Sequence, residues 1–185
     1  EIRIKATKVK ALLENNDRKM RELESVIQKR FGYGKDGISL TVERIQKKGL
    51  CAAAMAESLK LKLVNQVPLR LAANSVIKQA LAEEAKGCEV IISGKLQQQR
   101  AKSMKFKQGY MISSGQPKLD YLDVAVRHVF FKQGIMGVKV KIMKNYDPNN
   151  KQCANKPLPD FVEIADPKKD DNEEKIFSRV DDQHR

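Results

Sequence analysis

The 185-residue sequence predicts an α+β fold with two folded parts, followed by an extended C-terminal tail. Short runs in which every second residue is apolar indicate strands, and longer runs with apolar residues at helical spacing indicate helices. The tail begins near Tyr146, because four of the six prolines and no glycine lie beyond it. We expect one domain at residues 1–46, a second at 47–145 and an extended, partly disordered tail at 146–185.

The first part has the order strand, short helix, loop, helix, strand. Ile2, Ile4 and Ala6 alternate with basic residues, which favours a strand with one buried face. An apolar stripe at helical spacing marks the longer helix, and Asn16 or Asp17 is placed to cap it. In order, we expect a strand at 2–6, a helical turn at 8–13, a polar break at 14–17, a helix ending near 31, a turn at 32–37 and a strand at 38–42.

The second part combines helices with a small sheet. A break at Pro68 separates two helices, and Gly87 stands where the end of a helix favours glycine. In the last strand apolar residues alternate with Lys139, Lys141 and Met143, which predicts one buried and one partly basic face. In order, we expect helices at 50–64 and 68–85, strands at 89–93 and 104–112, a helix at 119–132 and a strand at 137–144.

Charge is the most unusual property of the chain. The formal net charge is +13, yet the residues from Tyr146 on hold 10 acidic and 7 basic side chains, so 13 acidic and 29 basic ones precede them. Between Val90 and Leu119 there is no acidic residue. A strand that leads into a segment with only cations is typical of a surface that meets a polyanion, and RNA is the commonest such partner. A flexible, solubilising loop is the alternative.

Candidate RNA-binding cations occur in both folded parts. Those that open the longer helix of the first part have Glu22 and Glu24 as intrahelical partners, so a solvated helix face is the alternative there. Those on the two helices of the second part are ordinary surface residues singly, but as a set they would form a basic wall along a single strand. The candidates are Lys8, Lys10, Arg18, Lys19, Arg21, Lys60, Lys62, Arg70, Lys78, Lys95, Arg100, Lys102, Lys105, Lys107 and Arg127.

The order of the first part matches the core of a KH domain, in which a Gly-x-x-Gly loop between two helices clamps the nucleic-acid backbone. Glu14-Asn15-Asn16-Asp17 occupies that loop position, so both glycines are absent and two carboxylates stand where phosphate would approach. Gly34-Lys35-Asp36-Gly37 fits the motif but lies between a helix and a strand, where a turn favours glycine. The sequence therefore predicts a partial type II KH domain without its backbone clamp.

Catalytic functions find little support in the sequence. His128 has no Cys or Ser nearby in a recognisable motif, and a structural or RNA-contacting role fits it better than a general base. Asp120 and Asp123 are interpreted as the start of the 119–132 helix, where negative charge is favourable. No phosphate-binding loop, dinucleotide motif or zinc spacing occurs, so we expect no cofactor, no metal and no enzyme activity.

The remaining composition fits a cytosolic protein. Cys51, Cys88 and Cys153 are odd in number and widely spaced, which favours reduced thiols over disulfides or metal ligands. An apolar run of about 20 residues, a lipidation signal and a secretory signal are all absent from the sequence, so we expect no membrane partner. The chain starts at Glu1 within a strand pattern, and we expect it to be an incomplete copy of a longer protein.

Nine short segments of the chain occur in a specific order and spacing. They are 26–32 (VIQKRFG), 49–52 (GLCA), 56–59 (AESL), 85–90 (AKGCEV), 93–96 (SGKL), 100–106 (RAKSMKF), 125–129 (AVRHV), 138–143 (VKVKIM) and 156–160 (KPLPD). Together they resemble the eukaryotic-type small-subunit ribosomal protein S3 family, and the likeness extends from Glu1 to Asp166. Each segment alone would be a weak signal.

The resemblance implies a structural component of the head of the small ribosomal subunit. An N-terminal KH domain would be followed by a domain that binds ribosomal RNA near the channel by which mRNA enters. The implied partners are small-subunit ribosomal RNA, mRNA and neighbouring ribosomal proteins. The implied location is the cytoplasm, within the ribosome, with assembly beginning in the nucleus. In the family an additional helix and strand precede the segment that starts here at Glu1.

One further departure from the family concerns mRNA. The family usually has two adjacent arginines at the start of the second helix of the second domain, which line the mRNA path and are associated with unwinding of structured mRNA. This chain has Arg70-Leu71, so only Arg70 is carried over, and another basic position reads Asn74. Lys78 lies one further turn along the helix. We therefore hypothesise a weaker electrostatic grip on incoming mRNA than is usual in the family.

Two other functions stay open at this point. A free KH-type regulator of selected RNAs would need the lost glycine loop, and the chain has few aromatic residues for base stacking. A strand-cleaving lyase with a Schiff-base lysine corresponds to an activity ascribed to some members of the family. Such a lysine has to be desolvated, and nothing in the sequence marks one.

Overall fold

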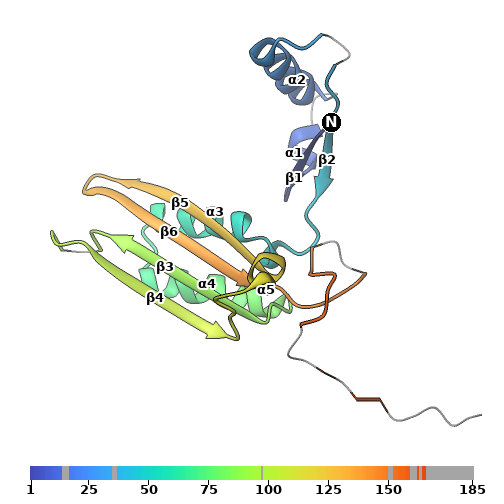
Figure 1. Cartoon of the computed structure of the whole chain (residues 1–185). Helices are drawn as coiled ribbons and strands as arrows, with labels where there is room; N and C mark the ends of the chain where they lie inside the picture. The colour runs from blue at the N-terminus through green and yellow to red at the C-terminus, as the bar shows by residue number, and fades with distance from the viewer. Residues whose placement is uncertain are drawn as a thin grey trace, which may run out of the picture.

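The structure, a computed structural model, describes residues 1–13, 17–34, 37–96, 98–149, 152–158, 162 and 164–165. It confirms the predicted α+β fold. The described residues form an N-terminal unit with a two-stranded sheet and a second unit with a four-stranded sheet. The N-terminal unit stands off one end of the larger sheet, as Figure 1 shows.

The N-terminal unit has the predicted order of elements. They are β1 (Ile2–Ala6), α1 (Lys10–Leu13), α2 (Arg18–Phe31) and β2 (Leu40–Arg44). β1 and β2 pair in parallel, so a crossover through the two helices is required between them. None of the described residues of this unit is fully buried, and Phe31 of α2 is 66% exposed.

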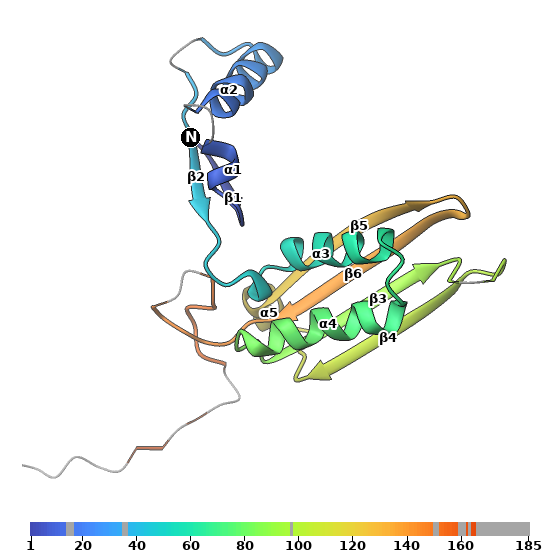
Figure 2. The ribbon, with the colours of Figure 1, turned by 180° about the vertical axis from the view of Figure 1, so that it is seen from behind.

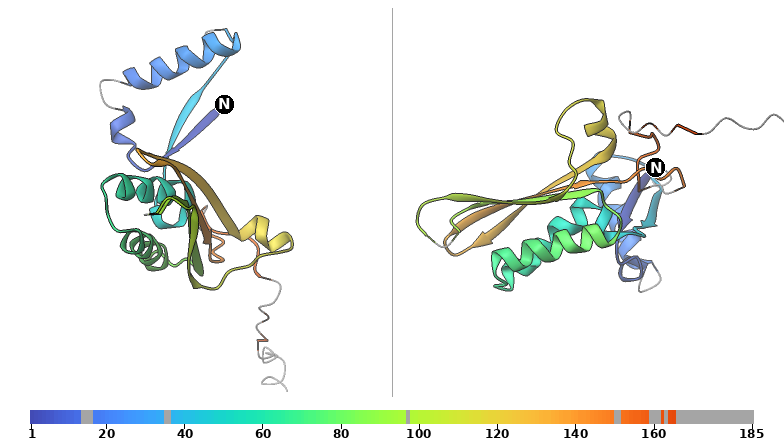
Figure 3. Two further views of the ribbon diagram at one scale, coloured as in Figure 1. Left: turned by 90° about the vertical axis from the view of Figure 1, so that its left-hand side faces the viewer. Right: turned by 90° about the horizontal axis from the view of Figure 1, so that it is seen from below.

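The second unit consists of a sheet with two helices on one face. Its elements are a 3-10 turn (Lys48–Leu50), α3 (Ala52–Val64), α4 (Leu69–Ala82), β3 (Gly87–Gly94), β4 (Lys102–Gly109), α5 (Gln116–Tyr121), β5 (Leu122–Phe131) and β6 (Gly134–Met143). The strand order is β4-β3-β6-β5, and every neighbouring pair is antiparallel. α3 and α4 lie side by side on one face of the sheet (Figure 2), and the view along the sheet shows the opposite face uncovered by either helix (Figure 3).

Alternation along the strands builds the core between sheet and helices. Val90 and Ile92 of β3 and Val138 and Val140 of β6 are all 0% exposed and face α3 and α4. Successive side chains of a strand point to opposite faces, so the residues between them lie on the uncovered face. The small alanines of both helices let them approach the sheet closely, and Ala72 is 0% exposed.

The prediction of a helix at 119–132 is wrong. Only α5 is helical there, and residues 122–131 form β5, the edge strand beside β6. Valine and phenylalanine dominate this segment, and such side chains pack well on a pleated surface but lose rotamer freedom in a helix. The register Phe131 opposite Gly134 closes a tight hairpin, and Gly134, the first residue after the turn, has a φ of +134°, a conformation that favours glycine.

Gly87 has a different role from the predicted helix end. α4 ends at Ala82, and Gly87 opens β3. A Cβ at Gly87 would overlap the backbone of Tyr110, and a Cβ at Gly109 opposite it, where φ is +80°, would overlap the backbone of Lys86 and Gly87. Two glycines thus allow β3 and β4 to meet closely at this end of the sheet.

The described start of the tail packs against the sheet. The backbone of Tyr146 pairs with Ala154, and the Tyr121 hydroxyl donates a hydrogen bond to the Lys156 carbonyl. Ala154 and Leu158 are buried with Tyr121 in a small second core. The segment from residue 146 therefore begins folded rather than extended, and most of the predicted tail lies outside the described residues.

Candidate nucleic-acid interface

The uncovered face of the four-stranded sheet carries lysines from β4 and β6, the two strands that flank β3. The register aligns Lys107, Glu89 and Lys141 in one row across β4, β3 and β6. Lys105 and Lys139 lie in the neighbouring row of the same face. We call these four lysines and Glu89 the lysine face.

Glu89 holds two of the lysines. Its side chain is only 4% exposed, its Oε1 lies 2.5 Å from Lys105 Nζ, and its Oε2 accepts a hydrogen bond of 3.1 Å from Lys141 Nζ. Burial raises the pKa of Glu89, but the hydrogen bonds from Lys105 and Lys141 outweigh burial and hold the pKa below its ordinary value. Glu89 is therefore ionised at neutral pH.

The other two lysines face solvent. Lys107 and Lys139 are exposed, and no hydrogen bond or ion pair joins either of them to another residue in the described part of the chain. The face thus has four cations and one carboxylate, and two of its cations are available to an external anion. The sequence prediction missed Lys139 and Lys141 as binding residues, although their alternation with buried apolar residues placed them on one face.

The predicted cationic segment from Lys95 to Lys107 divides between two faces. Lys105 and Lys107 belong to the lysine face, whereas Lys102 shares its side of β4 with Met104, which packs against the core. Lys95 and Arg100 lie in the connection between β3 and β4 and are exposed. Gln97 in this connection lies outside the described residues.

The predicted basic wall on α3 and α4 is reduced by internal pairing. Lys62 Nζ donates to Ser75 Oγ, and Lys60 Nζ lies 3.4 Å from Glu57 Oε1. Arg70 and Lys78 of α4 are exposed, with no ion-pair partner among the described residues. These two cations are the part of the predicted wall that stays exposed and without an ion pair among the described residues.

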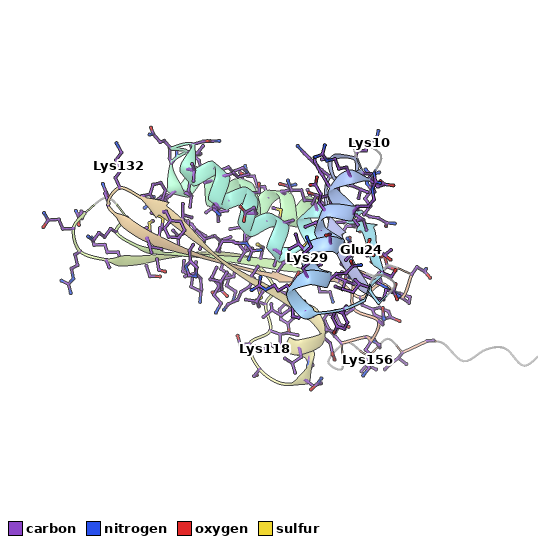
Figure 4. The ribbon with its side chains drawn as sticks, turned by 90° about the horizontal axis from the view of Figure 1, so that it is seen from above. Lys10, Glu24, Lys29, Lys118, Lys132 and Lys156 are labelled. Atoms are coloured by element: carbon purple, nitrogen blue, oxygen red, sulfur yellow. The ribbon has the colours of Figure 1, made fainter. Side chains whose placement is uncertain are left out.

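Three of the five candidate cations of the N-terminal unit, Arg18, Lys19 and Arg21, are engaged within it. Arg18 Nε lies 2.8 Å from Glu22 Oε1, and Lys19 Nζ donates to the Ala11 carbonyl over 2.7 Å. Arg21 also has an internal interaction, whereas Lys8 and Lys10 are exposed. Figure 4 shows Lys10 at the opposite end of the molecule from Lys132 at the tip of the β5–β6 hairpin. The cations of this unit are therefore not part of the lysine face.

Both glycine motifs lie partly outside the described residues. Glu14 to Asn16 of the lost clamp are not described, and Asp17 precedes α2 with a φ of 59° and no side-chain capping bond. In the other motif the Gly37 amide donates to the Gly34 carbonyl over 3.0 Å, as in a tight turn between α2 and β2.

The charged residues of β5 do not join the lysine face. Arg127 Nε lies 3.2 Å from Glu57 Oε2 of α3, so this predicted RNA-binding residue is bound to a helix. Asp123 Oδ2 accepts a hydrogen bond of 2.9 Å from the Ala52 amide at the start of α3. The prediction that Asp123 belongs to the start of a helix at 119–132 is wrong, because Asp123 lies in β5 and its carboxylate stabilises the N-terminus of α3 instead. His128 is exposed and lies on the uncovered face.

Other kinds of site receive no support from the described part of the chain. It contains no group of three or more His, Cys, Asp and Glu side chains arranged to hold a metal ion. No helix within it is long and apolar enough to cross a membrane. Its three cysteines are free thiols, and burial raises the pKa of Cys88 to about 12, with a smaller contribution from the Glu89 carboxylate.

Fold and surface together define a basic α+β protein with four lysines gathered on one sheet face. Residues 59–142 match the family described as Ribosomal protein S3, C-terminal domain. The chain is 51% identical over 168 residues to the small ribosomal subunit protein uS3 of Dictyostelium discoideum, and the alignment covers 90% of this chain and 77% of that protein. The chain belongs to the ribosomal protein S3 family, and as a ribosomal protein it has a structural rather than an enzymatic role.

Proposed function

We propose that this protein is a structural constituent of the head of the small ribosomal subunit, where it binds ribosomal RNA and neighbouring ribosomal proteins. The 51% identity over 168 residues carries this proposal, because the likeness spans both folded units and not the second unit alone. The protein acts in the cytoplasm within the ribosome, and its assembly begins in the nucleus.

The proposed division of labour follows the two units. Residues 1–46 are a KH domain that has lost its glycine clamp, residues 47–145 are the ribosomal RNA-binding domain, and residues 146–185 form the tail. The lysine face supports the second assignment, since Lys107 and Lys139 are exposed and lie on adjacent rows of one surface. Each such lysine near a phosphate releases condensed counterions, which makes binding strong and dependent on salt.

The protein further helps to line and guide mRNA at the channel by which it enters. Arg70 and Lys78 are the residues for this role, because both are exposed on α4 without an ion-pair partner in the described structure. Leu71, where the resemblance leads us to expect a second arginine, is 63% exposed and adds no charge. We expect a weaker grip on mRNA than in relatives that carry both arginines. A translation reporter with a stable hairpin measures this, and full unwinding efficiency would contradict it.

Sedimentation tests the proposed function directly. Lysate is fractionated on sucrose gradients at low and at high salt, and the protein is followed by antibody. A structural constituent migrates with small subunits and polysomes and stays there after a high-salt wash. Recovery in light fractions, or release by salt, would instead favour a free RNA-binding regulator.

A further inference from the structure

β5 is an edge strand with an open outer side. It pairs with β6 in an unbroken antiparallel register, from Leu122 opposite Met143 to Phe131 opposite Gly134. In such a ladder every second residue of an edge strand turns its N–H and C=O away from the neighbouring strand. No backbone hydrogen bond joins this outer edge to another segment that the structure describes.

The two edges of the sheet are protected differently. Edge strands are usually guarded by lysine, proline or a bulge, and β4 at the other edge has three exposed lysines. β5 has no lysine, no proline and no break in its register. Its charged residues Asp123 and Arg127 are bound to Ala52 and Glu57 of α3, and Arg127 Nη1 also donates a hydrogen bond of 2.9 Å to the carbonyl of Val126 in the same strand. Apart from this local contact, the described β5 edge is open to another strand.

Exposed apolar side chains follow the same edge on the uncovered face. Val124 is 42% exposed, Val126 45% and Phe130 72%. Ile135 of β6, directly opposite Phe130, is 60% exposed. An apolar strip beside unpaired backbone groups is the combination that strand addition uses, since hydrogen bonds give affinity and alternate side chains fill apolar contacts.

We propose that the β5 edge receives an extended segment of another protein, which adds a fifth strand to the sheet. The partner places apolar side chains against Val124, Val126 and Phe130 and a carboxylate near the exposed His128. Neutral backbone groups and an apolar strip select a polypeptide over RNA, because the lysines of this face belong to β4 and β6. The inference rests on the proposed function, in which the partner is a neighbouring protein of the small subunit.

Charge argues against a second copy as the occupant. Each copy has a formal net charge of +13. Pairing of two β5 strands would bring two chains of strong positive charge together, and like net charges oppose a close approach. The complementary partner is an acidic or weakly charged segment.

Hydrogen exchange measured by mass spectrometry on the peptide covering Leu122–Phe131 tests the inference. The free chain and purified small subunits are compared. We expect amides of this peptide that exchange quickly in the free chain to exchange at least about tenfold more slowly in the subunit. Equal exchange in both samples, with the chain present in the subunits, overturns the inference and leaves the proposed function intact. Absence of the chain from the subunits overturns both.

Two substitutions and a photo-crosslinker identify the cause of that protection. Val126→Lys places a charge on the β5 edge and should disfavour an added strand. Ser103→Lys is the matched control, because it adds the same charge at an exposed position of β4. We expect Val126→Lys to lose the protection, or its place in subunits, while Ser103→Lys keeps both; thermal unfolding confirms that each variant folds. Benzoylphenylalanine at position 130 should form an adduct with a protein of the subunit. Protection retained in Val126→Lys, or a crosslink to ribosomal RNA, would refute the added strand.

Discussion

Lys141 donates a hydrogen bond of 3.1 Å to Glu89 from the directly opposed position of the neighbouring strand, 52 residues away in sequence. Lys105 approaches the other carboxylate oxygen from the opposite side. One buried carboxylate thus fixes two lysines of different strands on a face that the helices do not cover. The remaining lysines of that face keep their full charge for a partner.

Replacement of Glu89 by Gln should destabilise the protein by about 1–3 kcal/mol at pH 7, because a buried carboxylate loses its charge-assisted hydrogen bond with Lys141 and its ion pair with Lys105. Denaturant unfolding measures the loss. Glu57→Gln is the matched control, since Glu57 pairs with Lys60 and Arg127 at a half-exposed site, and we expect it to cost less than about 1 kcal/mol. Equal losses in both variants would contradict the role of burial.

The same contact predicts a dependence of stability on pH. The pKa of Glu89 is lower in the folded chain than its ordinary value of 4.5, so the contact stabilises the fold above that value. The stabilisation is lost as pH falls below 4.5 and through the folded-state pKa. We therefore expect the difference between the native chain and Glu89→Gln to shrink from pH 7 to pH 3. A constant difference over this range would show that ionisation of Glu89 is not involved.

Gly87→Ala should destabilise the second unit by about 1–3 kcal/mol, because the new Cβ overlaps the backbone of Tyr110 and the strands have to shift. Gly34→Ala provides the control, since a Cβ there meets nothing within 4 Å. We expect the control to change the free energy of unfolding by less than about 1 kcal/mol. Thermal unfolding of the two variants separates the outcomes, and similar behaviour would disprove the close approach.

Leu71→Arg should strengthen binding of single-stranded RNA to the purified chain. Leu71 is 63% exposed on α4, so an arginine there reaches solvent without disturbing the core. One new phosphate contact steepens the plot of log affinity against log salt by about 0.7. Leu119→Arg on α5, where Leu119 is 74% exposed, adds the same charge away from Arg70. An identical gain in both variants would mean that only net charge matters.

Lys107→Gln and Lys139→Gln should each weaken RNA binding and flatten its salt dependence, because both lysines lack an internal partner within the described structure. Arg127→Gln should leave the salt dependence unchanged, since its guanidinium is bound to Glu57. Filter binding to a small-subunit RNA fragment at several salt concentrations distinguishes the three variants. Loss of affinity confined to Arg127→Gln would indicate that RNA binds beside α3, where Arg127 of β5 lies, and not on the lysine face.

The thiols should differ in reactivity. Cys88 is 0% exposed and burial raises its pKa to about 12, so iodoacetamide at pH 8 should not modify it in the native chain. Cys51 and Cys153 are partly exposed and should react. Intact-mass spectrometry counts the adducts before and after denaturation. A third adduct on the native chain would show that the sheet and helices open at Cys88.

The sequence predicted most elements because their patterns are local. A continuous apolar run marked β3, alternation marked β6, and Pro68 marked the break between α3 and α4. The segment that forms β5 was mistaken for a helix because both of its faces carry apolar residues. Neither the two-residue period of a strand nor the 3.6-residue period of a helix stands out in such a segment. Only pairing with β6 selects the strand. Membership of the ribosomal protein S3 family was readable from short motifs whose order is specific.

The candidate interface was less accessible to sequence reasoning than the fold. Lysines 105 and 107 were identified from the absence of acidic neighbours, but nothing local joins them to Lys139 and Lys141. That relation depends on which strands are neighbours and on their register. Pairing of Arg127 with Glu57 is likewise a tertiary fact, because the two residues lie on different elements.

The paired glycines at the end of β3 and β4 have a consequence for the chemistry of the surface. Gly87 and Gly109 lie opposite each other where the backbones come too close for any side chain. Slippage by one residue would turn Lys105 and Lys107 towards the hydrophobic interior and bring Phe106 out to water. Two residues without side chains therefore fix the register of the strand pair, and with it whether the solvent-facing side of β4 is cationic or apolar.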